Sequence, residues 1–178
     1  MTKKITLTAF CRDACCVLLL AVFSQQTFAQ SKANQLAGFS KVTTLVAYNA
    51  TGKSPFGITE ERLKTILELK LRANGLRVLT AEEDLKDPSV NPYVFLEVST
   101  LESRNKAGNA IGFAYGARLS IRLVARVPIN ESFAPIELWA RDTMGVSGTE
   151  QAPATTEKIV NELTEELLND WLAANPRR

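Results

Sequence analysis

Residues 113–127, FAYGARLSIRLVARV, alternate between two kinds of side chain over their whole length. The odd-numbered positions, from Phe113 to Val127, carry aromatic residues, aliphatic residues or alanine. The even-numbered positions include Arg118, Arg122 and Arg126, spaced four residues apart. Successive side chains of a β-strand point to opposite faces of a sheet. The pattern therefore predicts a strand with one buried face and one face open to water or to a partner.

The segments on either side of this strand predict a mixed α+β domain. Runs rich in β-branched and aromatic residues predict four more strands, at 41–50, 76–79, 93–103 and 136–146. Apolar residues at helical spacing predict helices at 59–74 and 155–174, and a capping box predicts a brief helical turn at 80–87. The order is β-α-β-β-β-β-α. If only one sheet face is apolar, both helices pack on that face. We therefore expect a two-layer sandwich with a mixed sheet of about five strands.

The first 29 residues have the three parts of an export signal. Lys3 and Lys4 form a positive start, and residues 17–23 are an unbroken apolar run. Thr27 and Ala29 then place small residues three and one positions before a likely cut. The apolar run is shorter than the roughly 20 residues that span a bilayer. We therefore predict a signal peptide at 1–29 and a single domain at 30–178. No stable membrane insertion is expected after cleavage, and residues 30–38 are expected to be a short flexible lead.

Cleavage would change the chemistry of the chain. Cys11, Cys15 and Cys16 all precede the expected cleavage site, so the mature chain has no thiol for disulfides or for lipid anchoring at a terminal cysteine. The segment also holds three basic residues and one acidic residue. Removing them takes the 21 basic residues to 18 and the 19 acidic residues to 18. A neutral domain has no overall field that attracts nucleic acid, so we expect no nucleic-acid partner.

The absence of histidine excludes several classes of enzyme and metal site. The chain contains no histidine at all. Catalytic triads that depend on histidine and the usual zinc and copper sites therefore have no ligand or base. A hydrolase without histidine, using paired carboxylates, a serine-lysine pair or a tyrosine, remains open. Most acidic residues, however, lie on predicted helix faces or turns, where solvation explains them. We expect no catalytic residue, no metal and no cofactor.

The open face of the 113–127 strand is the predicted binding surface. Arg118, Arg122 and Arg126 point to the same side of that strand. On the next strand Trp139 and Arg141 share a face with Glu137, and in one register that face lies beside the arginines. Arginine and tryptophan are common anchors of protein interfaces, which favours a docking surface. A solvated face with weak cross-strand ion pairs is the simpler alternative.

Three short segments resemble known exported proteins. Segments 113–115 (FAY), 139–145 (WARDTMG) and 172–176 (LAANP) are similar to a group of small bacterial secreted proteins without an established activity. The element order, size and export signal also resemble the N-terminal domain of TolB and the CsgG-like lipoproteins. The resemblance implies a non-enzymatic protein of the cell envelope.

The sequence therefore predicts a periplasmic or secreted accessory protein that is not an enzyme. It would act by contact with an envelope protein, through the open face of the sheet or by addition of a strand at its edge. The alternative is a periplasmic module that binds a small ligand or a glycan with the arginine and tryptophan face. A concave apolar pocket would favour the ligand, and a flat arginine-rich face would favour docking.

Overall fold

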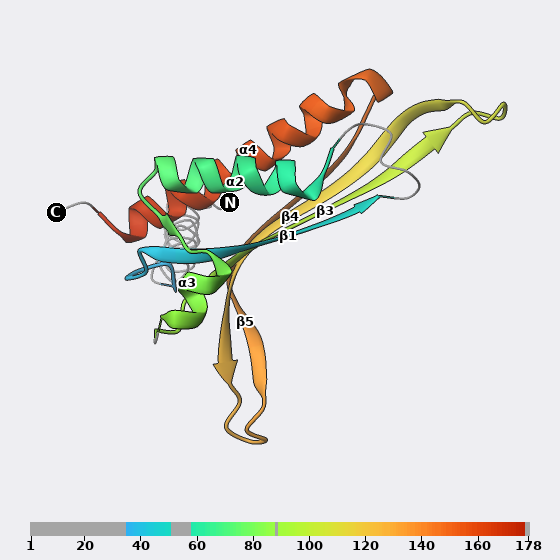
Figure 1. The fold of residues 1–178 in the computed structure, drawn as a ribbon. Coiled ribbons are helices and arrows are strands. Elements are labelled where there is room, and N and C mark those ends of the chain that lie inside the picture. Colours follow the sequence, from blue (N-terminus) through green and yellow to red (C-terminus); the bar gives the residue numbers. More distant parts are fainter. Residues whose placement is uncertain (1–34, 51–57, 88, 177–178) are drawn as a thin grey trace, which may run out of the picture.

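The computed structural model describes residues 35–50, 58–87 and 89–176. The predicted signal peptide and its cleavage site lie outside these residues. The described chain runs β1 (Lys41–Ala50), α2 (Glu60–Ala73), β2 (Arg77–Val78), α3 (Ala81–Lys86), β3 (Tyr93–Arg104), β4 (Ala110–Arg126), β5 (Phe133–Ser147), the short 3-10 helix η1 (Thr149–Gln151) and α4 (Ala152–Ala174). Figure 1 shows α2 and α4 together on one side of the sheet. The predicted two-layer α+β sandwich is confirmed.

The five strands form one mixed sheet in the order β2-β1-β3-β4-β5. β1 lies parallel to both β2 and β3, whereas β3, β4 and β5 form an antiparallel meander. The pairing of β1 with β2 is brief and covers Lys41 and Val42. β5 lies at the other end of the sheet and is much longer. One edge of the sheet is therefore a long strand.

The helices form where the sequence supplies caps and an apolar stripe. The side chain of Thr59 accepts a hydrogen bond from the backbone of Arg62 at the start of α2, and Thr80 and Glu83 form the predicted capping box of α3. α2 ends before Gly75, whose φ of 95° suits glycine. α4 begins three residues earlier than predicted, with a proline in its first turn.

The core lies between the sheet and the two long helices. α2 contributes three buried leucines, and α4 buries a stripe that ends at Trp171. The matching face of the sheet is formed by alternating residues of β1, β3 and β4. Trp171 donates its indole N–H to the carbonyl of Phe39 at 3.0 Å. Trp171 is therefore a core residue that also joins α4 to the chain before β1.

The chain before β1 is anchored, so the expectation of a flexible lead is wrong for its described part. Leu36 is fully buried in the core. The side chain of Asn175 donates to the carbonyl of Leu36 at 2.8 Å and accepts from the backbone N–H of Gly38 at the same distance. One leucine among polar residues gave no periodic signal, but its burial ties this segment to the end of α4.

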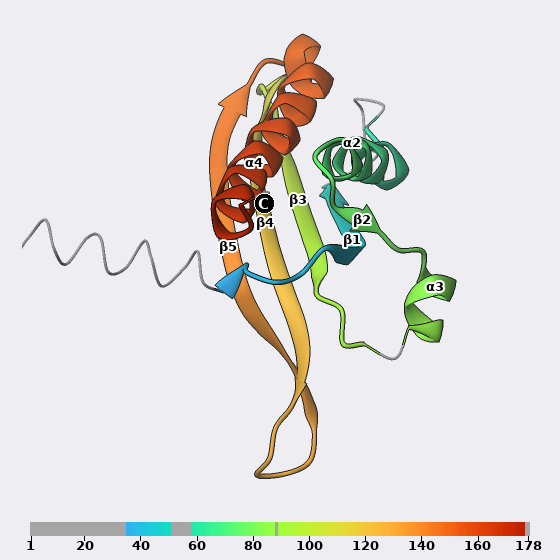
Figure 2. The same ribbon diagram turned by 90° about the vertical axis from the view of Figure 1, so that its left-hand side faces the viewer.

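The far end of the β4–β5 hairpin extends beyond the two-layer body. Figures 1 and 2 both show this hairpin projecting away from α2 and α4. Its turn is closed by a 2.7 Å hydrogen bond from the backbone N–H of Val127 to the carbonyl of Ser132. Ile129 and Phe133 are exposed near the tip.

α3 lies on the side of the sheet away from the two long helices (Figure 1). The sheet face that α2 and α4 leave uncovered is therefore bordered by α3 at one place and by the projecting hairpin at another.

Candidate functional site

We define the open face as the sheet side chains that point away from α2 and α4. The register aligns them in rows across β1, β3, β4 and β5. The rows are Thr43–Tyr93–Arg122–Glu137, Leu45–Phe95–Ser120–Ala140, Ala47–Glu97–Arg118–Asp142, Asn49–Ser99–Gly116–Met144 and, across the last three strands, Leu101–Ala114–Val146. One end of this face is therefore small and apolar, and its middle is charged.

The two central arginines of this face are paired with acidic residues of the same chain. One guanidinium nitrogen of Arg118 lies 2.8 and 3.0 Å from the two carboxylate oxygens of Glu137. Arg122 approaches the same carboxylate at 3.6 Å and stacks over the ring of Phe95, 4.6 Å from its centroid. The bond with Glu137 raises the pKa of Arg118 above its ordinary value. Both arginines therefore converge on one carboxylate.

Ser120 lies beneath these side chains. It is fully buried although it belongs to the open face. Arg118 reaches Glu137, which is aligned with Arg122, so its side chain crosses the row of Ser120. The Ser120 hydroxyl has no hydrogen-bond partner among the described residues. A buried hydroxyl without a partner reduces stability.

The structure places Trp139 and Arg141 on the helix-covered face, and their predicted place beside the arginines is wrong. Trp139 pairs with Ile121, whereas Glu137 pairs with Arg122, so one residue of β5 is extra between them. This bulge reverses the alternation of β5. Glu137 consequently lies on the open face. Trp139 lies on the opposite face, in the core, where only 3% of its surface is exposed.

These two residues instead hold α4 against β5. The Trp139 indole donates to the Asp170 carboxylate at 2.8 Å. Arg141 lies 3.4 Å from the same carboxylate and 3.3 Å from Glu166, one helical turn earlier on α4. Its guanidinium also lies 5.3 Å from the Trp139 ring centre. The pair therefore has a structural role between the two layers.

The third predicted arginine, Arg126, lies in the projecting part of the hairpin. It pairs across the sheet with Phe133 and makes a 2.9 Å ion pair with Glu131 near the turn. All three arginines of β4 thus have an acidic partner within the chain. The open face does not present a row of uncompensated positive charges.

A groove on the open face was not predicted from the sequence. We call it the open-face groove. It lies between α3 with the loop that follows it and the base of the β4–β5 hairpin. Its lining includes Thr43, Leu45, Asp84, Leu85, Val90, Tyr93 and Val124. The four aliphatic residues among them, Leu45, Leu85, Val90 and Val124, are all exposed. Large apolar side chains that gather in a hollow and remain exposed are typical of binding surfaces.

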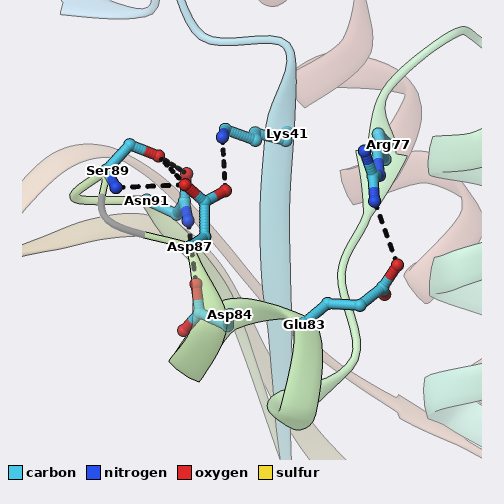
Figure 3. Close-up of polar contacts among 7 residues, drawn as sticks. All are labelled: Lys41, Arg77, Glu83, Asp84, Asp87, Ser89 and Asn91. Carbon is cyan, nitrogen blue, oxygen red and sulfur yellow. Dashed lines mark hydrogen bonds and ion pairs between the residues drawn. The ribbon is translucent and has the colours of Figure 1, made fainter.

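A polar cluster fixes the outer wall of this groove (Figure 3). Asp87 forms an ion pair with Lys41 of β1 and accepts 3.0 and 2.6 Å hydrogen bonds from the backbone and hydroxyl of Ser89. The bonds with Lys41 and Ser89 hold the pKa of Asp87 far below its usual range. Asn91 in turn donates to Asp84 at 2.9 Å. These bonds attach the loop after α3 to the sheet.

Asp84 is the one acid of α3 without an ion pair among the described residues. Glu82 pairs with Lys86 at 2.5 Å, and Glu83 pairs with Arg77 at 3.0 Å. Asp84 has only the amide of Asn91, which is uncharged. The lining of the groove therefore combines exposed aliphatic side chains with one uncompensated negative charge.

Two further observations concern metal binding and membrane spanning within the described residues. They contain no group of three or more carboxylate-bearing residues placed to hold a metal ion. Among the same residues, no helix is long and apolar enough to cross a membrane.

The chain matches no protein-family model and no curated protein. The comparison with solved structures gives matches at low identity and low TM-score. A minor lipoprotein from Acinetobacter baumannii is 12% identical with a TM-score of 0.41, and the match covers 77% of this chain and 94% of that one. A PelC dodecamer from Paraburkholderia phytofirmans is 14% identical with a TM-score of 0.38, covering 80% and 91%.

A putative neuraminyllactose-binding hemagglutinin homolog from Helicobacter pylori is 12% identical with a TM-score of 0.39, covering 77% of this chain and 88% of that one. None of these three is a TolB or CsgG protein. Likenesses at this level assign no function, which has to be argued from the residues of the open face.

Proposed function

We propose that this chain is an exported protein of the cell envelope that is not an enzyme and binds a partner protein through the open-face groove. The observation that carries the proposal is the groove itself, in which four exposed aliphatic residues from three separate segments line one hollow. The export signal predicted at 1–29 supports the location. The acids of the open face support a binding role, because the central ones are paired with arginine rather than placed for proton transfer.

The lining indicates the chemistry of the partner segment. Leu45, Leu85 and Val124 offer apolar contact, and burying such side chains contributes about 25 cal/mol per Å² of apolar surface. Asp84 at the wall offers a charge without an internal partner. A peptide segment with apolar side chains next to a lysine or arginine complements both features.

The glycan alternative has less support than the protein partner. An acidic glycan would need free cations, but Arg118 and Arg122 share Glu137, and Arg118 also lies 3.9 Å from Asp142. A concave apolar groove is also the feature expected for a small ligand, so a small apolar ligand is the second candidate for the same groove. The high exposure of its four aliphatic side chains favours the protein, because a protein segment would cover them over a wide area. The experiment below therefore separates the two occupants.

The test is photo-crosslinking in the native envelope from a reactive residue at position 85. The expected product is a covalent adduct with a protein, and sequencing should locate the attachment in an apolar segment with a neighbouring lysine or arginine. Leu45→Glu should abolish this adduct, because it puts a charge on the groove floor. Asp84→Lys should also abolish it by reversing the wall charge.

The matched control is Leu69→Glu. Leu69 is an equally exposed leucine, but it lies on α2, in the layer on the other side of the sheet. This variant should keep the adduct, and circular dichroism should show that all variants are folded. An adduct that persists in Leu45→Glu would overturn the proposal. Loss of the protein adduct with capture of a small molecule would favour the ligand instead.

A further inference from the structure

The edge of the sheet formed by β5 carries a second inference, independent of the proposed function. β5 pairs only with β4 among the described strands. Its bulge at Leu138 and its only proline, Pro135, both lie in the half toward the hairpin tip. From Trp139 to Ser147 the pairing with β4 continues without a register shift. This regular half leaves a row of backbone groups at an open edge.

Exposed edges usually have features that block pairing with another chain. Natural proteins use lysine, proline, bulges or very short strands for this purpose. Segment 139–147 has no proline or bulge, and its two charged residues, Arg141 and Asp142, precede segment 143–147, which carries no charge. Gln35, the first described residue, lines the same hollow as residues 137–142, so it lies beside the bulge and the first four residues of the regular half. The last part of β5, from Thr143, is the more open portion.

This portion also exposes large apolar side chains. Met144 is 81% exposed and Val146 is 82% exposed, and both lie on the open face. They stand next to the edge, where a neighbouring strand would cover them. Exposed apolar side chains that gather at one place on a protein surface often mark a site of contact with another protein. Here they lie on a strand that has no second neighbour among the described strands.

The sequence of this segment is complementary to itself in one antiparallel register. Centring the pairing on Gly145 aligns Met144 with Val146 of a second copy, and Val146 with its Met144. Thr143 and Ser147 are aligned in the same way on the other face. All these pairs bring together side chains of like character, and none opposes two equal charges. Centring on Asp142 would oppose two aspartates, and centring on Arg141 would oppose two arginines.

The residue at the centre suits a two-fold axis. A Cβ atom at Gly145 would lie 2.4 Å from the Tyr115 hydroxyl, so the ring of Tyr115 occupies the place of a side chain there. A glycine at the axis avoids any contact between two central side chains. Isologous contacts of this kind, in which the same patch meets itself, are the commonest in homo-oligomers.

We propose that the chain forms a symmetric dimer in which β5 pairs antiparallel with β5 of a second copy, centred on Gly145. The two sheets then form one continuous sheet of ten strands, twice the five of one copy. Because the two-fold axis of such an edge pairing is perpendicular to the sheet, both open faces lie on the same side. The dimer consequently presents two open-face grooves in one direction.

The first test is the mass of the exported protein in solution, measured by analytical ultracentrifugation over a range of concentrations. The expected mass is that of two chains. Met144→Lys combined with Val146→Lys should halve it, because four lysines would meet at the new interface. The matched control, Leu101→Lys with Ile111→Lys, changes exposed apolar residues of β3 and β4 outside the open-face groove and should remain a dimer.

The second test measures the register. A Met144→Cys copy and a Val146→Cys copy, mixed and oxidised, should form a disulfide between the two positions, identified by mass spectrometry. Each variant alone should give little crosslinking between identical positions. A monomeric wild-type protein at all concentrations, a lysine variant that stays dimeric, or a predominant bond between two copies of position 144 would each overturn the proposal.

Discussion

Ser120→Ala should make this protein more stable, although it removes a polar group from the middle of the candidate binding face. Ser120 is fully buried, and its hydroxyl has no hydrogen-bond partner among the described residues. A buried polar group left unsatisfied costs about 1–3 kcal/mol. Its neighbours in the row, Phe95 and Ala140, offer no side-chain acceptor.

The net gain is smaller than the full penalty. Removing one oxygen also removes its few van der Waals contacts, each contributing about 0.1–0.2 kcal/mol. We therefore expect a gain of about 1 kcal/mol in the free energy of unfolding. For a chain of this size, that corresponds to a rise of about 3 °C in Tm.

The assay is urea unfolding followed by circular dichroism, with Ser99→Ala as the matched control. Ser99 lies on the same face of the adjacent strand but is exposed, so its replacement should change stability by less than about 0.5 kcal/mol. If Ser120→Ala lowers the urea midpoint, the hydroxyl has a stabilising partner. Arg118 would then not cover an unpartnered hydroxyl.

Three further predictions concern the other contacts described. Trp139→Phe removes the indole bond to Asp170 and should cost about 1.5–3 kcal/mol by urea unfolding, as expected for a bond to a charged group; an unchanged midpoint would contradict this. The pKa of Asp87 is lowered in the folded state by Lys41, so its stabilisation is present above about pH 4 and is lost as the pH falls below that value. Asp87→Asn should therefore lose less stability than the wild type between about pH 6 and pH 3. Trp171→Ala should cost about 3–5 kcal/mol and broaden or abolish cooperative thermal unfolding, whereas near-native stability would exclude its core role.

The parts of the fold with a strong local pattern could be predicted from the sequence. The period-two pattern of residues 113–127 identified β4 and its two faces, and the order of elements predicted the two-layer sandwich. Thr59 and Thr80 marked helix starts because capping depends on nearby backbone groups. These features need no knowledge of distant contacts.

The candidate site could be predicted only in part, because distant segments form it. Arg118 and Arg122 were placed on the correct face by alternation within β4. The open-face groove needs β1, β3 and β4 to be neighbours in the sheet in that order, with α3 beside them, and this strand order has no local signal. Leu85 belongs to the predicted helical turn and Val90 to no predicted element, although both line the groove.

The bulge at Leu138 had no local signal either, yet it decides which residues belong to the site. In a regular strand Glu137 and Trp139 would lie on the same face of the sheet. If Glu137 stayed on the open face, every residue from Trp139 onward would then lie on the face opposite to the one it occupies. The extra residue directs Glu137 toward the arginines and Trp139 toward Asp170. It thereby neutralises the arginines of the open face and attaches α4 to β5.

Deleting Leu138 tests this reasoning. The residues that flank it already pair with consecutive residues of β4, since Glu137 pairs with Arg122 and Trp139 with Ile121. Deletion should therefore remove the bulge without changing either face, and should cost only the partial burial of one leucine, about 1–2 kcal/mol.

Deleting Ala140 is the matched control. It lies in the regular half of β5, so its loss must move Trp139 or the residues after it to the wrong face, at about 3–5 kcal/mol for an exposed core tryptophan. Urea unfolding should rank the two deletions in this order. Equal losses would mean that the register around Leu138 differs from the one described.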